Sequence, residues 1–368
     1  MKSTASELIA ELKNGERKNI ILDTDAYNEV DDQYTIAYAM LSPDRVNILS
    51  INAAPFLNRR STSAGDGMEK SYREIFHITG LTDSEAAKKI PVYRGSERFL
   101  PSKTEYVPSE ACDNIVRTVM ESNERVWIVA IGAITNVASA IIKEPAICER
   151  AALIWLGGHA LTCPDTKEFN LRQDIPAAEV VFDSGIPLVQ IPCDGVCSSF
   201  ITTIPEVEYY LRGKNDLCNY LCDITAAYTK EPYGWSKVIW DVTSIACITK
   251  PEALSMVVLP RPYVTSDCRY AFDASREQYV YIRKIRRDPI YADLFRKLCR
   301  HFFVSFKSHC KTSSCLSHRA EHDGIVEELC LRCFSDQLLR LRAAAPYRGS
   351  CRGACSYRPL RRPYTHPE

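Results

Sequence analysis

The sequence predicts an open α/β fold, in which a mostly parallel sheet carries helices on both faces. Along the chain, strand-like apolar runs alternate with segments whose apolar residues recur at helical spacing. This order of elements builds a parallel sheet through right-handed crossovers. Several runs, such as residues 126–131, are apolar at nearly every position, as expected of strands that are covered on both faces.

The expected elements follow one another from the N-terminus to about residue 300. An amphipathic helix over 6–12 comes first. The expected strands are 20–23, 46–53, 125–131, 152–156, 187–192 and 255–259, with a late edge strand at 279–285. The expected helices between them are 32–41, 64–79, 109–121, 136–143, 175–183, 216–229 and 241–249, and a closing helix follows at 288–300.

The composition changes after Arg300, where we place a domain boundary. This gives an α/β domain over residues 1–300 and an extension over residues 301–368. The extension is rich in Cys, Arg and Ser and lacks sustained periodicity, so we expect it to be poorly ordered. Its cysteine pairs do not have the two-residue spacing of a zinc ribbon at both ends, which argues against a zinc site there.

Composition also narrows the class of protein. The formal net charge is zero, which argues against nucleic acid as the main partner. No apolar run approaches the ~20 residues of a membrane span, and the charged segment 1–18 lacks a secretory apolar region. We therefore expect a cytoplasmic enzyme with neither a membrane nor a nucleic-acid partner. The cysteines within 112–299 are expected to be small buried hydrophobic residues.

Four aspartates and one glutamate lie within ten residues at the end of the first expected strand, in the segment Asp23-Thr-Asp-Ala-Tyr-Asn-Glu29-Val-Asp31-Asp32. Carboxylates this dense repel one another, and a fold that gathers them usually supplies a cation. A favourable helix dipole alone would explain Asp31 and Asp32. It does not explain Asp23 and Asp25, which end a strand at the edge where open α/β sheets bind ligands. The segment therefore predicts a cation site.

Two later motifs place further polar groups near strand or loop ends. Gly132 follows the third expected strand, and a glycine here would let the Ile131 carbonyl approach a metal. Thr135 would then be the N-cap of the next helix. In the second motif, Asp241 is either a plain N-cap or an oxygen ligand, and Trp240 is either a core residue or part of a binding site.

A third motif supplies groups suited to a sugar. The sequence Gly157-Gly158-His159 follows the fourth expected strand, and Glu168-Phe-Asn170 lies in the next loop. A carboxylate and an amide together can hold sugar hydroxyl groups. His159 alone is more typical of a hydrogen-bonded loop residue than of a catalyst.

Taken in order, these motifs resemble those of the inosine–uridine-preferring nucleoside hydrolases, which are calcium-dependent enzymes with a Rossmann-like core. The resemblance covers roughly residues 18–300 and also includes the segment from Ala177 to Gly185. It implies hydrolysis of the N-glycosidic bond of ribonucleosides to free base and ribose. It further implies a nucleoside as the small-molecule partner and a homo-oligomer, either a dimer or a tetramer.

The resemblance also implies a role for each matching residue. Ca²⁺ would be bound by Asp25, Asp32, Asp241 and the carbonyl of Ile131. Asp25 would in addition be the general base that takes a proton from a calcium-bound water. The ribose-binding residues would be Asp31, Asn58, Glu168, Asn170 and Asp241. The base-binding residues would be Trp240 and His159.

The chain departs from the family pattern at two places. Five residues separate Asp25 from Asp31, where the best-known members have three, which marks a subgroup. Trp240 stands where many members carry a histidine that protonates the leaving base, whereas purine-specific members have a tryptophan that stacks on it. Purine preference is therefore one of two open possibilities, and Tyr233 and Trp235 would supply a second aromatic wall.

Two other functions also remain open on the sequence. A non-catalytic nucleoside- or ribose-binding protein is favoured by the missing histidine, but the retained Asp25, Asp32 and Asp241 argue against it. A phosphatase of the haloacid dehalogenase type also begins with a strand-end Asp-x-Asp. That class needs Thr or Val two residues after its second Asp, where this chain has Tyr27.

Overall fold

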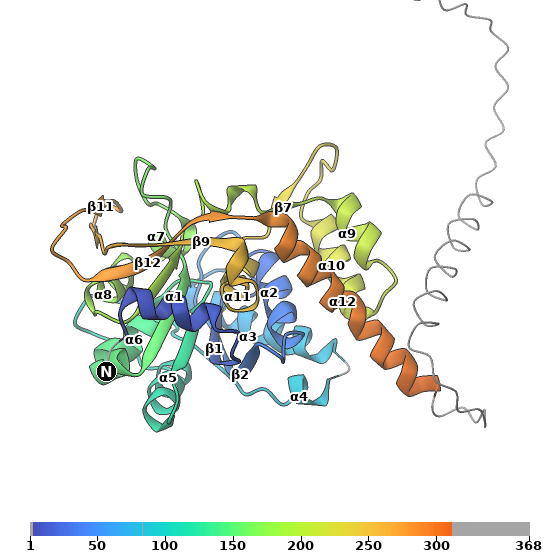
Figure 1. The fold of residues 1–368 in the computed structure, drawn as a ribbon, viewed down its shortest axis with the longest axis horizontal. Helices are drawn as coiled ribbons and strands as arrows, with labels where there is room; N and C mark the ends of the chain where they lie inside the picture. Colours follow the sequence, from blue (N-terminus) through green and yellow to red (C-terminus); the bar gives the residue numbers. More distant parts are fainter. Residues whose placement is uncertain (1–2, 83, 311–368) are drawn as a thin grey trace, which may run out of the picture. The chain divides into compact units, whose positions relative to one another are not determined.

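The computed structural model describes residues 3–82 and 84–310, of which 300–310 are described by their backbone alone. Within these residues lies an eight-stranded sheet with the strand order β3-β2-β1-β4-β5-β6-β12-β9 (Figure 1). All neighbouring strands pair in parallel except β12 and β9, which are antiparallel. The open, mostly parallel sheet expected from the sequence is confirmed.

The elements have the following bounds. The strands of the large sheet are β1 (Lys18–Thr24), β2 (Val46–Ala53), β3 (Val92–Tyr93), β4 (Val126–Ala130), β5 (Ala151–Leu156), β6 (Leu188–Ile191), β9 (Leu254–Pro260) and β12 (Gln278–Ile285). Two small antiparallel pairs are β7 (Ile201–Thr202) with β8 (Lys237–Val238) and β10 (Tyr263–Val264) with β11 (Tyr270–Ala271). The α-helices are α1 (Ala5–Lys13), α2 (Asp31–Met40), α3 (Ala64–Gly80), α4 (Glu85–Lys88), α5 (Glu110–Glu121), α6 (Thr135–Lys143), α7 (Phe169–Gln173), α8 (Ile175–Asp183), α9 (Ile204–Leu211), α10 (Asp216–Ala227), α11 (Val242–Thr249) and α12 (Arg287–Cys310). Among the helices of the described ranges, none has both the length and the apolar character of a membrane span.

Helices cover both faces of the sheet (Figure 1), and alternate residues of the central strands pack against the two helical layers. On β4, Trp127 and Val129 pack into the core cluster shared with α1, α2, α3, α10, α11 and α12. Val126 and Ile128 pack into the cluster shared with α5, α6 and α8. Because both faces of the sheet are covered, its central strands are apolar at consecutive positions.

The cysteines contribute to this packing as expected. No disulfide joins the ten cysteines between residues 112 and 299, and eight of them are buried. Cys218 and Cys247, for example, lie in the core cluster on the α1 face of the sheet. They act as small apolar residues.

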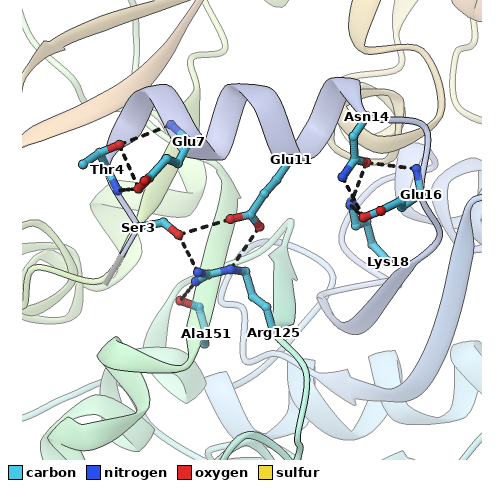
Figure 2. A network of polar contacts seen from close by, with 9 residues as sticks. All are labelled: Ser3, Thr4, Glu7, Glu11, Asn14, Glu16, Lys18, Arg125 and Ala151. Carbon is cyan, nitrogen blue, oxygen red and sulfur yellow. Dashed lines mark hydrogen bonds and ion pairs between the residues drawn. The ribbon is translucent and has the colours of Figure 1, made fainter. Parts of the chain in front are cut away.

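Helix α1 is tied to the beginnings of β4 and β5 by a polar network (Figure 2). Its N-terminus carries a capping box, in which the Glu7 N–H donates to Thr4 Oγ1 at 3.3 Å and the Thr4 N–H donates to the Glu7 carboxylate at 2.7 Å. Arg125, just before β4, lies 3.0 Å from the Glu11 carboxylate and donates to the carbonyl of Ala151 at 3.3 Å. The N-terminal helix is thus an integral part of the domain.

Two elements differ from the expectation. The sequence places strand 279–285 at an edge of the sheet, but β12 lies between β6 and β9, and β9 is the edge strand. Residues 279–282 are consecutively buried, as in an interior strand, and the pattern of one strand does not reveal its neighbours. The closing helix α12 also continues beyond Arg300 to Cys310, and residues 311–368 of the expected extension lie outside the described residues.

The packing of α1 predicts the effect of one substitution. Leu12 is completely buried against the sheet, so Leu12→Ala should lower the free energy of unfolding by about 2–5 kcal/mol. Lys13→Ala, at the exposed neighbouring position, is the control and should change it by no more than about 0.5 kcal/mol. Denaturant unfolding of the variants measures both, and equal stability of the two would contradict the packing of α1.

Candidate active site

The order of the strands changes direction between β1 and β4. On one side of this point the sheet continues through β2 to β3, and on the other through β5 to β6. Open α/β sheets bind ligands at such a switch point, beyond the carboxyl ends of the strands. In the parallel register Asp23 pairs with Ala130, so Asp25 lies level with Gly132 two residues further along. The two strands thus bring their polar ends together at the switch point.

A pocket of about 210 Å³ lies at this edge of the sheet, where small-molecule sites of open α/β folds occur. It is bounded by acidic, amide and aromatic side chains from several loops. The lining residues are Asp25, Asn28, Glu29, Asp31, Asp32, Ile131, Leu156, His159, Glu168, Phe169, Asn170, Cys193, Asp194, Trp240 and Asp241.

Four buried aspartates meet in the pocket from three parts of the chain. Asp25 follows β1, Asp31 and Asp32 form the first turn of α2, and Asp241 directly precedes α11. Oxygen atoms of Asp31, Asp32 and Asp241 lie within 4.8 Å of one another, a spacing at which one ion can contact all three. Asp25 lines the same pocket. The convergence expected from the sequence is therefore present.

The repulsion between carboxylates within this acid cluster (Asp25, Asp31, Asp32 and Asp241) favours the binding of a cation. Burial raises the pKa of Asp25, Asp32 and Asp241 well above the usual range, and the neighbouring carboxylates raise it further. Burial raises the pKa of Asp31 to about 6, against the opposing effect of Lys237. Asp25 Oδ2 and Asp31 Oδ1 are also buried without a hydrogen-bond partner. A cluster whose donor atoms are all oxygens fits a hard divalent cation.

One buried lysine offsets part of the negative charge. Lys237, at the beginning of β8, donates a hydrogen bond to the Glu29 carboxylate, and its Nζ lies 3.8 Å from Asp31 Oδ1. Burial lowers the pKa of Lys237, but Asp31 and Glu29 outweigh this effect and raise it. The lysine therefore remains charged and links the turn after β1 to the segment that leads into Trp240.

The side chain of Asp241 serves the pocket and does not cap α11. Asp241 occupies the N-cap position, but its side chain accepts no hydrogen bond from the helix. In contrast, the expectation that Thr135 is the N-cap of α6 is wrong. Thr135 is the first residue of that helix, and its hydroxyl donates to Asp174 at 2.6 Å, so the Asp174 carboxylate holds it away from the helix N–H groups.

The end of β4 is fitted closely against Asp25. A Cβ atom on Gly132 would lie 3.1 Å from Asp25 Cγ and 3.1 Å from Ala54 Cβ, so a larger residue would require these neighbours to shift by a few tenths of an ångström. Ile131 lines the pocket, and its carbonyl accepts a hydrogen bond of 3.3 Å from Asn170 Nδ2. The same amide donates to the Leu156 carbonyl at 3.1 Å and thereby spans the ends of β4 and β5.

Glu168 organises the loop that carries Asn170. Its carboxylate accepts the backbone N–H groups of Gly158, Asn170 and Leu171 at 2.9–3.0 Å and caps α7. Burial raises the pKa of Glu168, and these three hydrogen bonds oppose the rise. A carboxylate has about four acceptor positions, so Glu168 retains capacity for one more donor from a ligand.

Trp240, Phe169 and His159 bound the rest of the pocket. Trp240 and His159 are sequence-predicted base-binding residues, and both line the pocket. The second aromatic wall expected from Tyr233 and Trp235 is not present. Tyr233 is 95% exposed, and the ring of Trp235 lies beside Tyr228 at 6.1 Å.

Two residues of the predicted motifs lie outside the pocket lining. Asn58 donates from Nδ2 to Asn28 Oδ1 at 2.5 Å, so it supports a lining residue. Asp23 accepts a hydrogen bond of 2.9 Å from Asn136 Nδ2, and burial raises its pKa to about 7. Both residues lie near a strand end in the sequence, but this position does not predict the direction in which their side chains point.

Sequence reasoning assigned no role to several lining residues. Asn28 and Glu29 lie inside the acid-rich segment, and Phe169 lies between Glu168 and Asn170. Their position inside these motifs was the feature of the sequence that could have indicated a role in the pocket. Cys193 and Asp194 follow β6, and no motif in their local sequence indicated a role in the pocket. It is the order of the strands in the sheet that brings them beside the end of β5.

The fold and the acid cluster together define an α/β enzyme with an acidic small-molecule pocket at the switch point of its sheet. The chain matches the family described as "Inosine-uridine preferring nucleoside hydrolase" over residues 20–278. It is 28% identical over 269 residues to the pyrimidine-specific ribonucleoside hydrolase RihA of Escherichia coli O1:K1, covering 65% of this chain and 81% of that protein. It is 26% identical over 230 residues to a probable uridine nucleosidase 2 of Arabidopsis thaliana, covering 58% of this chain and 70% of that protein.

A solved structure with a similar fold is the purine-preferring ribonucleoside hydrolase from Gardnerella vaginalis, with a TM-score of 0.63 and 20% identity over 78% of this chain and 100% of that chain. Because the family match spans residues 20–278 of the 368, the chain belongs to the inosine–uridine-preferring nucleoside hydrolase family. The chain is therefore an N-glycosyl hydrolase, and the haloacid dehalogenase alternative is wrong.

The close fit at Gly132 generates a prediction. Gly132→Ala forces its Cβ against Asp25 and Ala54, and such crowding should lower the free energy of unfolding by about 1–3 kcal/mol. Gly80→Ala is the matched control because a Cβ at Gly80, the last residue of α3, meets no atom within 4 Å. Denaturant unfolding of the two variants compares them directly. A Gly132 variant as stable as the Gly80 variant would show that the approach of β4 to Asp25 is looser than described.

Proposed function

We propose that the pocket hydrolyses the N-glycosidic bond of ribonucleosides with Asp25 as the general base and Ca²⁺ as the cofactor. The observation that carries this assignment is the acid cluster itself, in which Asp25 Oδ2 is buried without a partner beside three further carboxylates. A polar ring of carboxylates and an amide suits ribose hydroxyl groups, and the adjacent aromatic wall suits a nucleobase.

The cation would be held by oxygen atoms alone. Asp25, Asp32, Asp241 and the carbonyl of Ile131 are the candidate ligands, and all four residues line the pocket. Carboxylate and carbonyl oxygens are the ligands that Ca²⁺ prefers. When bound, such an ion offsets the repulsion within the cluster and lowers the pKa of a water molecule at the site.

Each remaining side chain has a task in this proposal. Asp31 and Asn170 hold the 2′- and 3′-hydroxyl groups together with Asp241, and Glu168 accepts the 5′-hydroxyl. Asp25 removes a proton from the water that attacks C1′. Positive charge develops on the ribosyl ring as the bond to the base breaks, and the carboxylates beneath the ring stabilise it electrostatically.

The base preference depends on Trp240. Stacking of a base on an aromatic side chain contributes about 1–3 kcal/mol, and a purine offers the larger stacking surface. Phe169 adds a second aromatic ring to the lining. These side chains favour purines, whereas the two relatives compared by sequence are named for pyrimidine or uridine substrates. Assembly as a homodimer or homotetramer and a cytoplasmic location stay predictions.

Replacement of the general base tests the function. Asp25→Asn should lower ribose release from nucleosides by about 10²–10⁴-fold, since the amide cannot accept the proton, while nucleoside binding remains detectable. Asp44→Asn, at an exposed position outside the pocket, is the control and should release ribose at the wild-type rate. A reducing-sugar assay measures release, and an Asp25→Asn variant with full activity would refute the assignment of the base.

The same assay decides the base preference. Inosine and uridine, supplied side by side to the wild-type protein, should be cleaved with a higher kcat/KM for inosine if Trp240 stacks on the base. Trp240→Ala should then reduce the inosine-to-uridine ratio by about 5–150-fold, the equivalent of 1–3 kcal/mol. Equal cleavage of the two nucleosides would support the hydrolase function but would reject the purine preference. A protein that binds nucleosides but releases no ribose would be the non-catalytic binder.

A further inference from the structure

We propose that His159, oriented by Asp194, is the general acid that protonates the departing base. This inference rests on the proposed function, because it assigns the second proton transfer of the same reaction. As the bond between C1′ and the base nitrogen breaks, its electron pair stays on the base, which then needs a proton. The water oxygen forms the new bond to C1′, Asp25 takes the proton of that water, and Nε2 of His159 gives a proton to a ring nitrogen of the base.

The first argument is the identity of the groups around the pocket. Among the lining residues His159 is the one histidine. Trp240 has only an indole N–H, which does not act as an acid in water. Most lining carboxylates belong to the cluster around Asp25 or, like Glu168, already accept backbone hydrogen bonds. Burial raises the pKa of the Cys193 thiol well above its usual range, which makes it a poor proton donor.

The second argument is the orientation of the imidazole. Nδ1 of His159 is buried without a hydrogen bond and lies 3.8 Å from Asp194 Oδ2. Because Nδ1 lies toward Asp194, Nε2 is the nitrogen left for the pocket that His159 lines. The separation is longer than a hydrogen bond, as catalytic pairs often are before substrate binds. A carboxylate in this place fixes the rotation of the ring.

The third argument is that the backbone holds the two loops together. The Ala160 N–H donates to the Asp194 carbonyl and the Cys193 N–H donates to the Gly158 carbonyl, both at 2.8 Å. Gly158 has a φ of +77°, and a Cβ there would lie 2.1 Å from the Tyr270 hydroxyl, so the turn before His159 requires glycine. The His159 N–H is itself fixed by Thr166 Oγ1 at 3.0 Å. Because backbone hydrogen bonds join the two loops, the side chains of His159 and Asp194 are preorganised relative to each other.

The fourth argument is the position of His159 relative to Asp25. Asp25 follows β1 and His159 follows β5, with β4 between them. Neighbouring strands lie about 4.8 Å apart, so the two strand ends are separated by roughly 10 Å. The pocket thus offers a base at one side and an acid at the other.

The dependence on the leaving group tests this role. We would compare the wild-type protein, His159→Gln and Asp194→Asn on inosine and on p-nitrophenyl β-D-ribofuranoside, whose phenolate departs without a proton. The proposal predicts that His159→Gln lowers kcat for inosine by about 10²-fold or more and leaves kcat for the aryl riboside unchanged. Asp194→Asn should show the same selective loss, but smaller. His77→Gln, an exposed histidine on α3, is the control and should match the wild type on both substrates.

The outcomes separate this inference from the function on which it rests. Equal losses on the two substrates, or no loss on inosine, would overturn the acid role of His159 while hydrolysis stands. If the wild-type protein cleaves neither substrate, the proposed function fails and the acid role fails with it. Thermal unfolding of each variant shows whether a loss comes from misfolding, and His159→Asn then provides a second variant for the same comparison.

Discussion

The repulsion among buried carboxylates at the carboxyl end of β1 is the constraint on which the site depends. Four aspartates in one pocket are unfavourable unless positive charge balances them. The fold provides part of this charge from its own chain, since Lys237 pairs with Glu29 and lies next to Asp31. The N-terminus of α2 adds a favourable dipole for Asp31 and Asp32, which have no competing side-chain cap. In the proposed function, a bound cation supplies the rest of the balance.

The sheet explains how such a cluster is held in place. Its strands are covered on both faces, so their ends are rigid and set the positions of the loops that follow them. The switch in strand order between β1 and β4 lies at the pocket, which Asp25 and Ile131 both line. Further along the edge, the loops after β5 and β6 carry His159 and Asp194. In the proposed function, the acidic side of the pocket binds the ribose and the aromatic side binds the base.

The sequence was a good guide where a pattern depended on local order. Asp25, Asp32 and Asp241 converge as predicted because each stands at an element end on the same edge of the sheet. It was a poor guide where the outcome depended on a partner far along the chain. Lys237 resembles a surface lysine until Glu29 and Asp31 are placed beside it.

Side-chain direction was the second limit of the sequence. Thr135 has the residue type of an N-cap, but Asp174 takes its hydroxyl hydrogen bond. Asn58 follows a strand near the pocket, but its amide binds Asn28. The strand β12 was expected at an edge of the sheet, but its pairing with β6 and β9 makes it interior. In each case a competing contact, invisible in the local pattern, determined the result.

Calorimetric titration of the metal-stripped protein with Ca²⁺ tests the central claim most directly, because it measures the cation that the carboxylates require. The account predicts one Ca²⁺ site per chain, abolished by Asp32→Asn, and a stabilisation of about 2.7 kcal/mol when free Ca²⁺ is a hundredfold above its Kd. A folded protein that takes up no Ca²⁺, or an Asp32→Asn variant that binds it as tightly as the wild type, would contradict the account.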